Sequence, residues 1–231
     1  MTLGEHVVTE FTPVARRLGL FSGGVTVVLI AAYAITLAVG LWSLKSPQQP
    51  IADPMLWILE VLIIAMMPAM VSLMVAVHAW APTRVKTLTL VAVVFMGLLA
   101  GLTCSVHFAI LTLSRQIAFA EQPWLALFFS FKWPSVVYAL DILAWDVFFP
   151  LSMLFAAPAF RGSRLAAWIR VLMIASSVLS FAGLSGVVVG DMQLRNIGIV
   201  GYVGVFLMVA VLLVVIFYRT VPNDGLTRRC S

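Results

Sequence analysis

Four ionisable side chains stand in stretches of the sequence that are otherwise apolar, and their types could support chemistry inside a membrane. They are Glu60, His107, Asp141 and Asp146, the last two within the run YALDILAWDVFFP at 138–150. Carboxylates and imidazoles in such stretches usually face the protein interior, where they bind ions, carry protons or pair with other polar groups. A carboxyl group shielded from water also holds its proton more readily, which makes proton coupling chemically reasonable.

The four side chains lie at similar depths along the apolar stretches that carry them. At a helical rise of 1.5 Å per residue, Glu60, His107 and Asp141 lie about 9 to 10 Å from the outer ends of their stretches, and Asp146 lies about 17 Å in. This agreement predicts one polar cavity in the outer half of the membrane. In an α-helix Asp141 and Asp146 are about 140° apart, so we expect them on different faces of a central helix.

Three further side chains share a helical face with members of this set. Tyr138 and Trp145 lie on the face of Asp141, and Cys104 lies on the face of His107. The predicted ligand-binding residues are therefore Glu60, Cys104, His107, Tyr138, Asp141, Trp145 and Asp146.

Serine residues offer a structural alternative to a functional site. Polar side chains commonly hydrogen-bond one another between membrane helices, and the next apolar stretch carries four that could pair with the acids: Ser176, Ser177, Ser180 and Ser185. Asp191, Arg195 and Asn196 follow that stretch. We expect these three residues to form a solvated turn at the outer mouth rather than part of the site.

Three classes of function fit this set of residues. The first is the binding or transport of a small molecule or cation, with proton coupling as an option. The second is an intramembrane enzyme in which Asp141, Asp146 and Glu60 act as catalytic acids and bases on a lipid or isoprenoid, since paired carboxylates in different surroundings can divide those roles. The third is a non-catalytic subunit of a membrane complex.

The sequence predicts no metal site and no cofactor, because it carries no phosphate loop, dinucleotide fingerprint or zinc motif. The expected partners are membrane lipid and a small-molecule, lipid or cation ligand. A second copy of the chain or another membrane subunit is a further candidate partner.

The composition of the chain determines its broad class. Of 231 residues, 63% are hydrophobic and only 10% are charged, whereas a soluble domain carries roughly 25% charged residues. So few charged residues cannot cover a surface in water, and the sequence therefore predicts a polytopic membrane protein. The formal charge of +5 does not indicate nucleic-acid binding, because the basic residues lie between apolar stretches and form no patch with aromatic residues.

Six stretches reach the roughly 20 residues needed to cross a membrane: 18–44, 55–80, 87–113, 135–160, 165–190 and 197–218. We therefore predict an all-α fold, a six-transmembrane-helix bundle that forms one domain over residues 18–218. Residues 1–17 are expected to be a cytoplasmic N-terminal segment and residues 219–231 a cytoplasmic tail.

The distribution of lysine and arginine predicts the orientation. Basic residues concentrate on the cytoplasmic side of membrane proteins. One set of connections and ends carries Arg16, Arg17, Arg84, Lys86, Arg161, Arg164, Arg219, Arg228 and Arg229, whereas the opposite connections carry only Lys45, Arg115, Lys132 and Arg195. Both termini should therefore be cytoplasmic, and the small size and short loops suggest a bacterial cytoplasmic membrane.

The segment 117–133 is rich in aromatic residues and too short to be a seventh span. It carries Trp124, Phe128, Phe129, Phe131 and Trp133. Aromatic side chains of this kind concentrate at the membrane–water interface, which predicts an interfacial anchor on the outer side. A lid over the polar cavity is the alternative.

Overall fold

The computed structural model describes residues 11–44, 51–114, 116–119 and 122–222, without the side chain of Phe119. The regular elements of this part of the chain are all helical. The predictions made for residues 1–10 and 223–231, and for Lys45, Arg115, Arg228 and Arg229, fall outside the described residues.

Six helices of the described chain are long and apolar enough to cross a membrane, as the sequence predicts. They run over Pro13–Trp42, Met55–Trp80, Thr83–Thr112, Val136–Ala159, Arg164–Val189 and Met192–Arg219, and we number these spans one to six. Span one is helix α1 and span two is α2, while span three consists of the short turn η1 (Thr83–Val85) and α3 (Lys86–Thr112).

The last three spans are built from shorter pieces. Span four joins α5 (Val136–Ile142), η3 (Leu143–Phe148), α6 (Phe149–Ala156) and η4 (Ala157–Ala159). Span five joins α7 (Arg164–Gly183) and α8 (Ser185–Val189). Span six joins η5 (Met192–Arg195), α9 (Asn196–Ile199), η6 (Val200–Val205) and α10 (Phe206–Arg219).

The first helix begins at Pro13, five residues before the predicted start at 18. Thr12 is its N-cap, and the Thr12 hydroxyl accepts a 3.2 Å hydrogen bond from the backbone N–H of Ala15. A capping hydroxyl followed by proline at the first helical position is a strong start signal. Arg16 therefore belongs to the helix, where its guanidinium donates to the carbonyls of Phe217 and Tyr218 at 3.1 and 2.7 Å.

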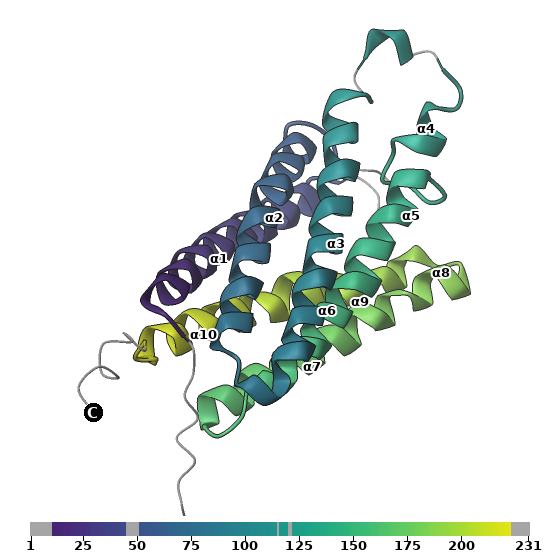
Figure 1. Cartoon of the computed structure of the whole chain (residues 1–231). Coiled ribbons are helices and arrows are strands. Elements are labelled where there is room, and N and C mark those ends of the chain that lie inside the picture. The colour runs from purple at the N-terminus through teal and green to yellow at the C-terminus, as the bar shows by residue number, and fades with distance from the viewer. Residues whose placement is uncertain (1–10, 45–50, 115, 120–121, 223–231) are drawn as a thin grey trace, which may run out of the picture.

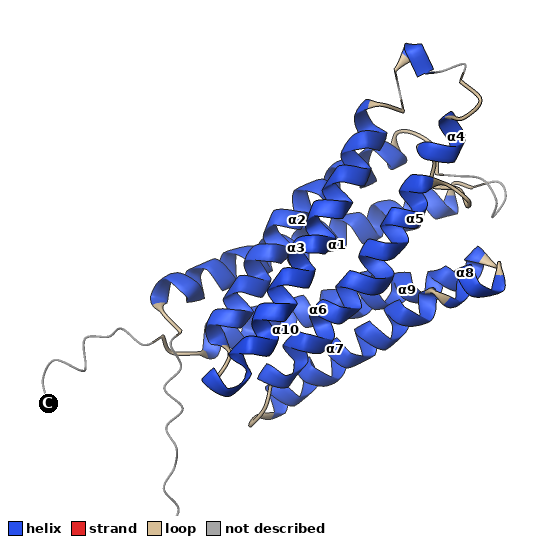
Figure 2. Cartoon of the chain, turned by 45° about the vertical axis from the view of Figure 1, so that its right-hand side comes forward, coloured by secondary structure: helices blue, strands red, loops and turns tan. Residues whose placement is uncertain are grey.

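The six spans form one bundle in which α1 packs against α2 and α10, and α2 packs against α3 (Figures 1 and 2). Span four packs against α3 on one side and α7 on the other, so it is contacted on two sides as predicted. Each of the other spans also packs against two neighbours, and the contacts therefore do not single out span four as a central helix. The start of α1 and the end of α10 lie at the same end of the bundle (Figure 1). The short helix α4 (Leu125–Phe128) lies at the opposite end, beside the start of α5.

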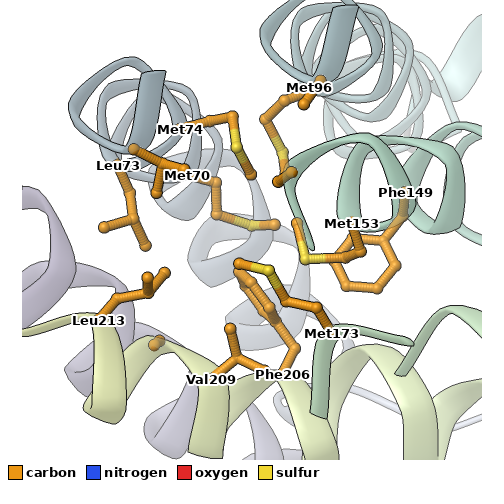
Figure 3. Packing of buried hydrophobic residues seen from close by; sticks show 14 of the residues in the cluster. Met70, Leu73, Met74, Met96, Phe149, Met153, Met173, Phe206, Val209 and Leu213 are labelled. Atoms are coloured by element: carbon orange, nitrogen blue, oxygen red, sulfur yellow. The ribbon is translucent and has the colours of Figure 1, made fainter. Parts of the chain in front are cut away.

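Methionine side chains from four spans fill the centre of the bundle. Met70 and Met74 of α2, Met96 of α3, Met153 of α6 and Met173 of α7 point toward one another and toward aliphatic and aromatic residues of α10 (Figure 3). Thioether chains are flexible and polarizable, so they fill irregular gaps between helices that differ in tilt. Among the described residues, the buried charged side chains and His107 lie outside this group of methionines.

Candidate functional site

Five ionisable side chains form one continuous buried series, which we call the ionic chain. The Nδ1 atom of His107 is hydrogen-bonded to Glu60 Oε2 at 2.7 Å, and the other ring nitrogen, Nε2, lies 3.5 Å from Asp141 Oδ1. Arg195 completes the series, because its Nη2 donates to Asp141 Oδ2 at 2.6 Å and its Nε donates to Asp146 Oδ2 at 3.1 Å. The five residues expose between 0% and 7% of their surfaces.

Each member of the ionic chain comes from a different helical element. Glu60 lies near the start of α2, and His107 lies near the end of α3. Asp141 lies in α5, Asp146 lies in η3, and Arg195 is the last residue of η5. The structure thus brings together the four ionisable residues predicted from their depths and adds a fifth.

Arg195 contradicts the prediction of a solvated turn. Asp191 and Asn196 are exposed, as predicted, but Arg195 is buried and pairs with both aspartates. The reason is a tight fold of the connection between spans five and six. The Asp191 side chain caps η5 by accepting a hydrogen bond from the N–H of Gln193 at 3.0 Å. Gly186 packs so closely on the same turn that an added Cβ would lie only 3.1 Å from the backbone nitrogen of Arg195.

A charge argument could have found Arg195 in the sequence. Two carboxylates buried in one helix need a cation, because a buried unpaired charge is strongly destabilising. No lysine or arginine stands in the middle of any of the six apolar stretches. Arg195 lies two residues before the sixth stretch, at the outer ends of the stretches, and from there its long side chain can extend toward the acids.

A π-helical turn explains how both aspartates reach the same guanidinium. Leu143–Phe148 follows the wider π pattern, in which the N–H of Phe149 bonds to the carbonyl of Ala144 five residues earlier. Positions five apart lie closer in angle on a π turn than on an α-helix, and such turns are frequent at functional sites. The prediction that Asp141 and Asp146 diverge is therefore wrong, because the α-helical angle of about 140° does not apply here.

The serines of span five do not pair with the acids. Ser176 donates to the carbonyl of Gly201 at 2.9 Å, and Ser177 donates to the carbonyls of Pro150 and Met173 at 3.0 and 2.8 Å. Ser180 donates to a carbonyl within α7, and Ser185 of α8 donates to the carbonyl of Ala182 in α7. These hydroxyls therefore satisfy backbone groups, including a carbonyl of the π segment η6, and leave the acids to Arg195 and His107.

The three predicted neighbours of the site have different positions. The ring of Tyr138 lies under the Arg195 guanidinium, with 4.5 Å from Cζ to the ring centroid, which is a cation–π contact. Trp145 is buried against Tyr202, with ring centroids 5.0 Å apart, and no hydrogen-bond partner of its Nε1 lies within the described residues. Cys104 instead packs, half-buried, against the methionine core.

One carboxylate oxygen of the ionic chain lacks a donor. Asp146 Oδ1 is fully buried and has no hydrogen-bond partner among the described residues. It lies between Gly183 and Gly198, where an added Cβ would approach it to 2.9 and 2.6 Å respectively. Spans five and six thus both place a glycine against this oxygen. The missing side chains leave space for the carboxylate, but neither glycine supplies a compensating charge.

Phe131, in the segment 117–133, packs against the ionic chain. The ring of Phe131 lies 5.2 Å from the ring of His107 and 6.1 Å from that of Tyr138. Ser135 caps α5 through its hydroxyl oxygen and donates to the carbonyl of Ser130, which ties this segment to the start of span four. Trp124 and Phe128 are exposed, so the segment combines a covering part with a part suited to the interface.

Within the described residues, no three histidine, cysteine or acidic side chains converge as metal ligands. Comparisons of the chain with protein-family models, with curated proteins and with solved structures find no match.

Proposed function

We propose that this multi-pass membrane protein binds a cation or a small cationic molecule in the outer half of the membrane and exchanges it for a proton. The observation that carries the proposal is the charge of the ionic chain. Its three carboxylates face one permanent cation, Arg195. Even when His107 is counted as an imidazolium, one negative charge remains.

A buried excess charge of this kind requires a counter-ion. Removing an ion from water costs several kcal/mol unless a partner compensates it. A proton on one of the acids supplies that compensation when no ligand is bound. A ligand cation supplies it otherwise, so ligand binding and proton release compete for the same charge.

Asp146 is the acid best suited to hold this proton. It has a single 3.1 Å bond to Arg195, whereas Asp141 has a 2.6 Å bond to Arg195 and a further approach to His107 at 3.5 Å. Its second oxygen has no donor within the described residues. A neutral carboxyl group tolerates such surroundings far better than a carboxylate does.

The orientation and membrane remain part of the proposal. With both termini in the cytoplasm, as the basic residues predict, the ionic chain lies in the outer half and the segment 117–133 lies between it and the outer surface. The bacterial cytoplasmic membrane is the proposed location. The exchange path then leads past Phe131.

The enzyme prediction, with Asp141, Asp146 and Glu60 acting on a lipid or isoprenoid, has less support. Each of these carboxylates already bonds to a nitrogen of His107 or Arg195, so a substrate would first have to displace a protein partner. Expression of the chain alone tests the prediction of a non-catalytic subunit. A subunit that needs its partner would not yield a stable purified protein.

Proton release on cation addition tests the proposal. Purified protein in weakly buffered detergent is titrated with Na⁺, K⁺ and tetramethylammonium while a pH dye reports released protons. Up to one proton per chain is expected from the wild type with a cation that binds. Asp146→Asn should release none, and Asp53→Asn, the same change at an exposed aspartate in the connection between spans one and two, should behave as the wild type.

Infrared spectroscopy provides a readout that does not depend on the choice of cation. The C=O stretch of a protonated carboxylic acid should be present in the wild type and absent in Asp146→Asn. Equal proton release from the wild type and Asp146→Asn, or a wild-type spectrum without this band, would contradict the assignment of the proton to Asp146. Failure of all three cations to release protons would count against cation exchange itself.

A further inference from the structure

A groove lined by apolar residues and by two arginines lies at the other end of the bundle. It has a volume of about 510 Å³ and follows the first turns of α7, with Phe160 and Arg161 at one end. Phe160 is fully buried and stacks on Trp80, with ring centroids 5.1 Å apart, so this end of the groove has a rigid base. The groove lies beyond the methionine core from the ionic chain and shares no residue with it.

One stripe of α7 forms the length of the groove. Ala167, Arg170, Val171 and Ile174 line it, and their spacing of three, four and seven residues places them on one face of the helix. From Ala167 to Ile174 the stripe is about 10 Å long at 1.5 Å per residue. An acyl chain can lie along such an apolar stripe.

Two arginine residues are among those that line this apolar groove. Gly162 adopts a positive φ of 91°, a conformation that glycine reaches readily, and it turns the chain so that Arg161 and Arg170 line the same groove. Within the described residues, neither arginine has an acidic partner. Arginine binds phosphate groups through paired N–H donors.

We propose that this groove binds one anionic phospholipid, with the phosphodiester on Arg161 and Arg170 and an acyl chain along Ala167, Val171 and Ile174. Basic pockets between or beside membrane helices at the cytoplasmic side recognise anionic headgroups in this way. The combination of two arginines with an apolar stripe distinguishes the site from an ordinary lipid-facing helix surface, which offers apolar contact without a fixed cation.

Native mass spectrometry of the full-length protein in detergent tests this site. Phosphatidylglycerol and phosphatidylcholine with identical acyl chains are added at equal concentration, and the bound fraction of each is measured. Each arginine is expected to contribute about fivefold to the preference for the anionic lipid. Arg161→Gln with Arg170→Gln should therefore lower that preference by about 25-fold.

Two further variants separate the groove from general surface charge. Arg84→Gln with Arg219→Gln removes two arginines from the same end of the bundle but outside the groove, and the preference should persist. Val171→Trp fills the groove without changing charge, and since Val171 is largely exposed the fold should tolerate it. This variant should lose the bound phospholipid.

Each outcome decides the proposal. Loss of preference in the groove variants with retention in the control pair supports it. An unchanged preference after removal of Arg161 and Arg170, or full lipid binding by Val171→Trp, overturns it. Displacement of phosphatidylglycerol by millimolar inorganic phosphate would show that the arginines serve a soluble phosphate compound, and this too would overturn the lipid assignment.

Discussion

Replacement of Arg195 by methionine tests whether the ionic chain depends on its permanent cation. The substitution keeps a long side chain and removes the guanidinium, which bonds Asp141 at 2.6 Å and Asp146 at 3.1 Å. Three acids then remain beside His107, with no other cation among the members of the chain. The Arg195→Met protein should be strongly destabilised, because the partner charges are left buried.

The expected loss of stability in Arg195→Met follows from the burial of Arg195 and its two aspartate partners. Removing one partner of a buried ion pair lowers the free energy of unfolding by about 3–5 kcal/mol. Replacing all the charged partners together by uncharged residues often changes that free energy little. Arg195→Met should therefore lower the free energy of unfolding by about 3–5 kcal/mol. Adding Asp141→Asn and Asp146→Asn to the same protein should return that free energy to within about 2 kcal/mol of the wild type.

Equilibrium unfolding in mixed micelles, titrated with sodium dodecyl sulfate and followed by tryptophan fluorescence, measures these differences. Arg84→Met provides the control, because Arg84 is exposed and should change stability by no more than about 0.5 kcal/mol. If Arg195→Met proves too unstable to purify, the yield of the triple variant reports the rescue instead. Equal stability of Arg195→Met and Arg84→Met, or no rescue by the asparagine changes, would refute the reasoning.

Three other substitutions probe the close contacts of the bundle. Gly198→Ala places a methyl group 2.6 Å from a carboxylate oxygen of the ionic chain. It should lower the free energy of unfolding by about 1–3 kcal/mol in the same assay. Gly97→Ala is the control, because its methyl group meets open space and should not destabilise the protein. Met70→Ala empties part of the methionine core and should cost about 2–5 kcal/mol, measured in the same way; a loss below 1 kcal/mol would mean that the core collapses around it. Phe131→Ala removes the ring that covers His107, so the ring N–H of that histidine should exchange faster with solvent in ¹⁵N NMR spectra, and an unchanged exchange rate would exclude a covering role.

The predictable part of the site follows from distance along the helix. The distance of a residue from the end of its helix follows from the helical rise, and apolar stretches long enough to span a membrane indicate where the six helices lie in the chain. For this reason Glu60, His107 and Asp141 could be placed at one level from the sequence alone, and the structure joins them within 3.5 Å of one another in series.

The angular part of the site depended on local geometry that the sequence does not reveal. The π turn at Leu143–Phe148, which packs against α3 and α7, changes the angle between Asp141 and Asp146. Cys104 shows the same limitation, since a shared helical face with His107 did not bring it to the ionic chain but to the methionine core.

Arg195 marks the boundary between what the sequence determined and what the tertiary structure decided. Composition and the length of the apolar stretches determined six helices that are long and apolar enough to span a membrane, and the positions of the buried acids along them, because these depend only on hydrophobicity and helical rise. The partner of those acids lies 49 and 54 residues away in the chain, in a segment whose composition is typical of a solvated turn. Only the packing of span six against span four brings it to them, because the pairing of buried charges is a long-range contact that no local pattern encodes.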